Sequence, residues 1–260
     1  DHFIRTTDEY HEKAVQALFR KLMDNGDIYL GKYEGYYCAQ CEAYVKDADV
    51  DACPECGRPP ERISEENYFF RLSRYEKPLL DHIDANPEFI LPLYRRNEVR
   101  SRVAEGLDDL SVSRSSFDWG VGIPDDEKHV IYVWVDALMN YITALGAPDD
   151  PDGKLEKYWP ADVHLVGKDI IWFHCVIWPA LLMSLGLELP KTVFAHGWWT
   201  IKGNKISKRK GNIIYPREVY EKYGELLTGG SVIRLIGGDR TDSEKKPGKK
   251  CSRLVEPRED

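Results

Sequence analysis

The sequence predicts an α/β protein that carries a small metal-binding lobe, and three observations lead to this class. Short apolar segments alternate with helical segments in the second half of the chain, which is typical of a parallel sheet with crossover helices. Two C-x-x-C pairs lie close together between Cys38 and Cys56. A loop rich in lysine and arginine, residues 203–212, follows the last predicted strand.

The length and the net charge of the chain limit the classes of protein to which it can belong. The chain has 260 residues, enough for one large domain or two small ones, and a net charge of −8. This charge argues against a broadly basic nucleic-acid-binding surface but allows a local basic site. Because no signal peptide is recognisable, we expect the cysteine pairs to lie in a reducing, cytoplasmic compartment, and Asp1 predicts a piece of a longer chain. The apolar run 170–187 is short for a membrane span and predicts a buried helix.

The N-terminal region predicts one helix and one strand. Thr6 and Glu9 have the spacing of a capping box, and apolar residues recur every three or four positions as far as Met23. Asn25 and Gly26 predict the helix end. Residues 28–37 form an aromatic-rich, strand-like run, which we expect two glycines to interrupt.

The four cysteines predict a structural zinc site. Cys38 and Cys41 form one C-x-x-C turn, and Cys53 and Cys56 form the second. Each turn directs two thiolates at one metal ion, so two turns complete a tetrahedral site with no open position. One such turn alone would equally suit a redox dithiol, but two at this spacing favour zinc, which would stabilise a lobe too small for its own core.

Two further helices are predicted before residue 106. Pro78 suits the start of a helix over 79–83, and a second helix is expected over 97–105. Arginines cluster around the second helix, and a solvated face is the simplest interpretation of them. A phosphate contact is an alternative that the sequence indicates less strongly. They are Arg95, Arg96, Arg100 and Arg102.

The second half predicts the parallel sheet itself. The expected strands are 129–135, 162–166 and 192–195, with a helix over 136–145 after the first and an apolar helix after Gly167-Lys168-Asp169. The continuous apolar strands indicate a sheet covered on both faces. In such sheets ligands bind beyond the carboxyl ends of the strands, which is where the basic loop begins.

The basic loop reads G-N-K-I-S-K-R-K-G-N over residues 203–212. Glycines near both ends favour mobility, and its four cations suit a polyphosphate whose charge builds up in a transition state. A plain solvated basic turn is the alternative reading. A helical piece is expected over 213–223, and the final twenty residues are expected to be disordered.

These pieces together resemble one family, the methionyl-tRNA synthetases among the class I aminoacyl-tRNA synthetases. The loop is similar to the KMSKS signature, and the cysteine lobe is similar to the zinc-bearing connective insertion of that family. Stretches over about residues 1–224 match it in order. They are Phe3–Thr7, Asn67–Phe70, Ser113-Arg114, Phe117–Gly120, Val133–Ala137, Gly167–Asp169 and His196-Gly197.

The resemblance implies the second half of a Rossmann-like catalytic domain with an inserted zinc lobe. It implies the activation of methionine by ATP with Mg²⁺ to methionyl-adenylate, followed by transfer to tRNA(Met). Lys208, supported by Lys205, would stabilise the triphosphate. The remaining ATP-binding residues carried over are Gly167, Asp169, His196, Gly197 and Ser207.

The resemblance also implies a methionine side-chain pocket. A polarisable thioether packs well against aromatic rings, and such a pocket discriminates by about 1–3 kcal/mol per methylene. Each member could instead be ordinary core packing. The residues are Trp134, Ala137, Leu138, Tyr141, Ile170 and His174.

Several features depart from the family. No HIGH motif occurs in the chain, no anticodon-binding domain follows the signature, and Arg209 stands where the family usually has serine. We therefore expect these 260 residues alone to be inactive. The expected divisions are 1–28 (catalytic-domain helix), 29–115 (zinc insertion), 116–224 (second half of the catalytic domain) and 225–260 (tail).

Two other functions are compatible with the sequence. A zinc-stabilised module that binds RNA or another partner without catalysis would use the cysteine lobe and the arginine cluster. A class I synthetase for another apolar amino acid would share the signature loop. No membrane association is expected, and the sequence gives no oligomeric state.

Overall fold

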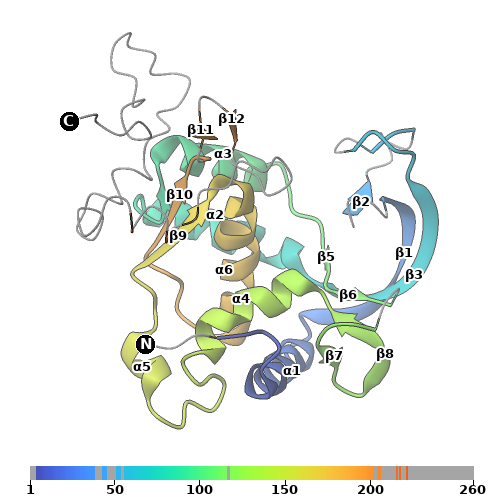
Figure 1. Cartoon of the computed structure of the whole chain (residues 1–260), viewed down its shortest axis with the longest axis horizontal. Helices are drawn as coiled ribbons and strands as arrows, with labels where there is room; N and C mark the ends of the chain where they lie inside the picture. The colour runs from blue at the N-terminus through green and yellow to red at the C-terminus, as the bar shows by residue number, and fades with distance from the viewer. Residues whose placement is uncertain are drawn as a thin grey trace.

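The structure, a computed structural model, describes residues 4–38, 43–45, 51–53, 56–115, 118–198, 200–201 and 204–205, with Tyr215, Arg217 and Glu221. Helices pack beside a short parallel sheet to form the body of the structure, and a long curved β-hairpin extends from this body (Figure 1). Among the described helices none is long and apolar enough to cross a membrane. The predicted helix over 213–223 and the tail lie outside the described residues, apart from the three single positions named above.

Helix α1 (Glu9–Asp24) confirms the first predicted helix, but not its predicted cap. Its apolar stripe is buried, with Val15 and Phe19 fully inside the core. The expected capping box at Thr6 is wrong, because the helix begins after Asp8 and no side chain caps it. The Asp8 carboxylate instead accepts a hydrogen bond from the backbone N–H of Arg5, at 3.1 Å.

The extended hairpin is part of a four-stranded antiparallel sheet in the order β2-β1-β3-β5. Its strands are β1 (Ile28–Cys38), β2 (Ala43–Val45), β3 (Glu61–Phe70) and β5 (Leu110–Ser111). The expected interruption at two glycines is wrong: Gly31 pairs with Asn67 and Gly35 with Ile63. A side chain at Gly31 would lie 3.2 Å from the rings of Phe69 and Tyr29, so glycine leaves room for their stacking.

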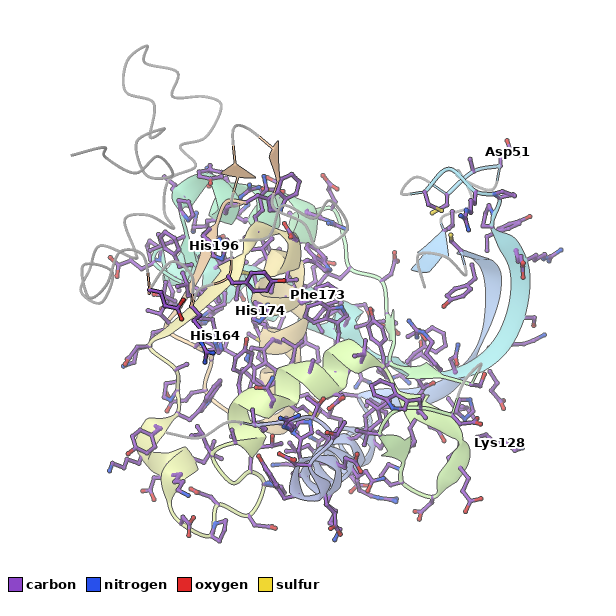
Figure 2. All side chains as sticks on the ribbon, in the orientation of Figure 1. Asp51, Lys128, His164, Phe173, His174 and His196 are labelled. Carbon is purple, nitrogen blue, oxygen red and sulfur yellow. The ribbon has the colours of Figure 1, made fainter. Side chains whose placement is uncertain are left out.

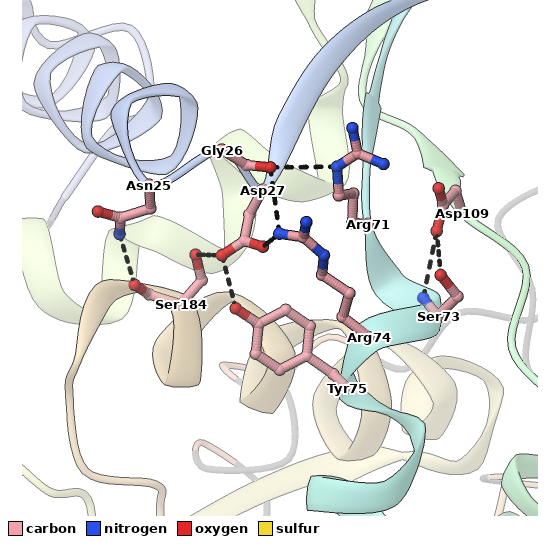
Figure 3. A network of polar contacts seen from close by, with 9 residues as sticks. All are labelled: Asn25, Gly26, Asp27, Arg71, Ser73, Arg74, Tyr75, Asp109 and Ser184. Carbon is pink, nitrogen blue, oxygen red and sulfur yellow. Dashed lines mark hydrogen bonds and ion pairs between the residues drawn. The ribbon is translucent and has the colours of Figure 1, made fainter.

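The base of this hairpin is attached to the body through Asp27, whose side chain is 9% exposed (Figure 3). Its carboxylate accepts hydrogen bonds from Tyr75 (2.7 Å), Ser184 (2.7 Å) and Arg74 (2.9 Å). Burial alone would raise the pKa of Asp27, but these donors stabilise the carboxylate and the net pKa is lowered. Burial and the Asp27 charge raise the pKa of Tyr75 to about 12.

Two helices follow the hairpin. After a 3₁₀ turn, η2 (Leu72–Tyr75), come α2 (Glu76–Ala85) and α3 (Leu93–Ala104). Both begin earlier than predicted, α3 directly after Pro92. On α3, Arg100 makes a two-pronged contact with Asp84, with both N···O distances at 2.7 Å. Arg100 is therefore a partly exposed arginine paired with one specific carboxylate, which agrees with the solvated-face interpretation.

The predicted strand 129–135 is partly wrong. Strand β8 (Asp126–Ile131) ends early and lies in an antiparallel sheet, β6-β8-β7, with β6 (Ser113–Arg114) and β7 (Gly122–Ile123). The rest of the apolar run begins helix α4 (Val133–Thr143). An unbroken apolar run hides such a boundary, since strand and helix periods cannot be told apart in it.

The parallel sheet has the order β4-β10-β9. Strands β9 (Val163–Gly167) and β10 (Thr192–His196) confirm two predictions, and the third strand is β4 (Ile90–Leu91) rather than β8. Between β9 and β10 the chain forms η3 (Lys168–Ile170), the π-helical turn η4 (Phe173–Ile177) and α6 (Trp178–Leu185). This apolar segment is buried as predicted.

The remaining described elements are α5 (Lys154–Tyr158), β11 (Thr200–Ile201) and β12 (Asn204–Lys205). The main core joins residues of α1, α2, α3, α4 and α6 with the parallel sheet. A second, small cluster in the lobe contains Cys38, Val45 and Cys53.

Candidate functional site

The carboxyl end of the parallel sheet brings two predicted residues together. Gly167 ends β9 and pairs with His196 at the end of β10. A side chain at Gly167 would lie 3.9 Å from Cε1 of His196. The His196 Nδ1 atom lies 2.7 Å from the carbonyl oxygen of Gly197. Because a carbonyl only accepts, Nδ1 carries the proton.

Asp169 lies beside this pair, on the turn η3. It is exposed, as is Trp198, whose indole Nε1–H donates a hydrogen bond to its carboxylate oxygen Oδ1. The neighbouring Lys168 places its ammonium 4.0 Å from the centre of the Trp198 ring. The edge of the sheet therefore presents an anion and a cation on consecutive residues.

An aromatic cluster lies next to the sheet edge, between α4 and η4. Trp134 of α4 stacks on Phe173 of η4 at 3.8 Å between ring centroids. The Tyr141 hydroxyl lies 2.9 Å from Nε2 of His174. Figure 2 shows Phe173, His174 and His196 gathered near β9, β10 and the start of α6.

The hydrogen bonds of His174 determine its tautomer. Its Nδ1 atom lies 3.0 Å from the carbonyl oxygen of Ile170, so Nδ1–H donates to that oxygen. Burial lowers the pKa of His174, partly offset by this hydrogen bond, and the ring is neutral at pH 7. The Tyr141 hydroxyl therefore donates to Nε2. Burial also raises the pKa of Tyr141, so this wall of the cluster is polar at two atoms but uncharged.

The structure adds residues to this cluster that the sequence analysis missed. His164 of β9 is 5% exposed. The centroid of its ring lies 4.3 Å from that of Tyr141 and 6.0 Å from that of His174. Burial, together with His174, lowers the pKa of His164 to about 4. Trp178 lies 6.1 Å from Tyr141. Its position four residues after His174 puts both on one helical face, and this spacing could have identified it.

The other predicted pocket residues are near the cluster but differ in burial. Ala137 and Ile170 are half-buried, whereas Leu138 is 1% exposed within the main core. Lys205 belongs to β12 and pairs with Thr200 of β11. Ser207 and Lys208 lie outside the described residues, as does most of the basic loop.

Three of the four predicted zinc ligands are brought together at the lobe. The Sγ atoms of Cys38, Cys53 and Cys56 all lie within 4.8 Å of one another, and those of Cys38 and Cys56 are 3.4 Å apart. Cys41 lies outside the described residues. The second turn is closed by hydrogen bonds from Cys53 N to Arg58 O and from Gly57 N to Cys53 O, both 2.8 Å. Gly57 has φ +71°, a left-handed conformation that favours glycine.

Thiolates around one zinc ion lie about 3.8 Å apart, as follows from Zn–S bonds of about 2.3 Å in a tetrahedron. The cysteine spacing in this lobe fits that arrangement without a large rearrangement. Two of these cysteines are buried, and they make up most of the lobe's small core together with Val45.

The sheet topology, the lobe and the aromatic cluster together define a class I tRNA synthetase fold, and comparison with known proteins supports this. The sequence profile described as "tRNA synthetases class I (M)" matches residues 1–64 and 56–227. The chain therefore belongs to this family.

Similar curated proteins indicate which class I synthetases this chain resembles in sequence. The chain is 59% identical over 226 residues to the methionine–tRNA ligase of Caldanaerobacter subterraneus subsp. tengcongensis. This match covers 86% of this chain and 35% of the relative. It is 50% identical over 254 residues to that of Thermotoga maritima, covering 95% of this chain and 40% of the relative.

Solved structures that are similar to this chain include methionyl-tRNA synthetases. The Mycobacterium tuberculosis methionyl-tRNA synthetase bound by methionyl-adenylate superposes with a TM-score of 0.77 and 50% identity. The match covers 86% of this chain and 45% of that structure. The chain thus spans less than half the length of these relatives.

Proposed function

We propose that the protein containing this chain is a methionine–tRNA ligase. It would activate methionine with ATP and transfer the methionyl group to tRNA. The observation that carries the proposal is the aromatic cluster of Trp134, Tyr141 and His174 beside the carboxyl end of the parallel sheet, in a chain of the class I family. The methionyl-adenylate in the Mycobacterium tuberculosis relative supports it.

The cluster suits the methionine side chain. The stacked rings of Trp134 and Phe173 offer a flat apolar surface, which a thioether contacts favourably. The neutral His174 and the Tyr141 hydroxyl provide polar atoms without a charge. A charged wall would favour acidic or basic substrates, so the uncharged wall favours an apolar amino acid.

The adjacent sheet edge suits the nucleotide. Asp169 and His196 lie at the ends of neighbouring parallel strands, where ligands of such sheets bind. In this proposal Asp169 contacts the ribose, and Lys205 and Lys208 stabilise the triphosphate with its Mg²⁺. The amino-acid carboxylate attacks the α-phosphorus of ATP and pyrophosphate leaves, so the protein contributes positioning and charge stabilisation.

We infer a structural role for zinc at Cys38, Cys41, Cys53 and Cys56. The three described Sγ atoms already lie at distances that fit shared coordination. When bound, the ion would hold the tip of the β1–β3 hairpin together, where there is little other core.

The proposal is tested by methionine-dependent exchange of pyrophosphate into ATP, measured with the full-length protein. Methionine, leucine and isoleucine are compared at equal concentrations, and a Lys208→Ala variant is the control. We expect exchange with methionine only, reduced in the variant. Exchange driven by leucine or isoleucine would assign a different amino acid, and salt-sensitive tRNA binding without any exchange would support the non-catalytic alternative.

A further inference from the structure

Trp198 lies in the connection between the end of β10 and the start of β11, and it contacts two consecutive residues of another segment. Its Nε1–H donates to Oδ1 of Asp169, and its ring face lies 4.0 Å from the ammonium of Lys168. Both partners belong to η3, directly after β9. One side chain thus links the carboxyl ends of two parallel strands.

The indole is suited to hold these opposite charges at once. Its N–H only donates, so it binds the carboxylate, and its electron-rich face attracts the ammonium. A cation over the ring draws electron density toward itself and strengthens the N–H as a donor, so the two contacts reinforce each other. The ammonium of Lys168 thus has a partner on the ring face, and the carboxylate of Asp169 has one at the ring edge.

The place of Trp198 in the chain connects this contact to the basic loop. Trp198 follows His196 by two residues and precedes β11 by two, and β11 pairs with β12, which begins that loop. Trp198 is 42% exposed, so it lies at the surface where the nucleotide would bind. The contact is therefore made at the site, outside the hydrophobic core.

We propose that Trp198 is a positioning residue for the nucleotide. It fixes the orientation of the Asp169 carboxylate toward the ribose hydroxyls of ATP and keeps the Lys168 ammonium over its own ring face. This inference rests on the proposed function, because it assigns the nucleotide to the same sheet edge. Trp198 acts through Asp169 and takes no part in the bond that forms.

The test compares three variants of the full-length protein in the pyrophosphate-exchange assay. Trp198→Phe keeps the ring face and removes the N–H, Trp198→His keeps a ring N–H donor, and Trp119→Phe is a matched control on a tryptophan that is 75% exposed elsewhere. We expect Trp198→Phe to raise the KM for ATP about tenfold, the effect of one charge-assisted hydrogen bond. The KM for methionine and kcat should change less than twofold, and Trp198→His should recover most of the loss.

Three results would overturn the inference. One is a KM for ATP in Trp198→Phe equal to that of Trp119→Phe. Another is a joint rise in the KM values for ATP and methionine together with a lower melting temperature, which indicates a merely structural role. The third applies if Trp198→Phe does not fold: a tenfold rise in the KM for ATP of Trp198→His then contradicts the role of the N–H. A KM for ATP of Trp198→His near that of the wild type supports this role.

The outcome remains separable from the proposed function. Should the wild-type protein show no methionine-dependent exchange, ATP binding is measured directly by equilibrium dialysis. A tenfold weaker affinity in Trp198→Phe, but not in Trp119→Phe, would still support the positioning role. Equal affinities would contradict it.

Discussion

Replacement of Asp27 by alanine should destabilise the protein strongly, because this carboxylate joins three segments. The side chain is 9% exposed and accepts hydrogen bonds from Arg74, Tyr75 and Ser184. A hydrogen bond to a charged group contributes about 1.5–3 kcal/mol. The Arg74 side chain is 55% exposed, so water screens its share, which is then about 0–1 kcal/mol.

The expected loss is therefore about 3–7 kcal/mol, most of it from the Tyr75 and Ser184 hydroxyls left without their acceptor. For a chain of this size each kcal/mol lowers the melting temperature by about 2–4 °C. Urea unfolding followed by fluorescence measures the free energy of unfolding directly. Asp81→Ala is the control, since that carboxylate is 65% exposed and pairs only with Lys77 on its own helix among the contacts described. Equal unfolding midpoints for the two variants would refute the reasoning.

Three other predictions follow from the site and the lobe. Tyr141→Phe should raise the KM for methionine about three- to tenfold at an unchanged KM for ATP, because it removes the hydrogen bond to His174, and a Tyr158→Phe control on exposed α5 should change neither. The free energy of unfolding should fall as the pH drops from about 6.5 toward 4, because the lowered pKa of His164 in the folded state makes the unfolded state bind the proton first. The loss is at most about 3 kcal/mol. Urea unfolding of His164→Phe should show a flatter pH dependence than that of the wild type. Cys38→Ser should lower the zinc content below the expected one ion per chain in elemental analysis, whereas Cys251→Ser should not; equal zinc in both variants would exclude the cysteine site.

Local patterns predicted those elements whose signal is confined to a short segment. The strands β9 and β10 and the turn after Gly167 follow from short apolar runs bounded by turn residues, and the structure confirms them. The cysteine spacing likewise predicted the cluster at Cys38, Cys53 and Cys56. In both cases neighbours in sequence determine the geometry.

The sequence could not give the boundaries that depend on packing. Residues 129–135 read as one apolar strand, yet the chain turns from β8 into α4 within that run. Strand β4, only Ile90–Leu91, is too short to show a period and is defined by its pairing with β10. His164 was missed because a lone histidine in an apolar strand carries no signal until α4 and η4 pack beside it.

In the proposed function, the cluster of Trp134, Tyr141 and His174 binds methionine while Asp169 and His196 face the nucleotide. A crystal structure of the full-length protein with a non-hydrolysable methionyl-adenylate analogue tests this most directly. We expect the thioether to lie against the Trp134 ring and the Tyr141 hydroxyl, with the ribose beside Asp169. An analogue bound away from these residues, or with its side chain outside the cluster, would contradict it.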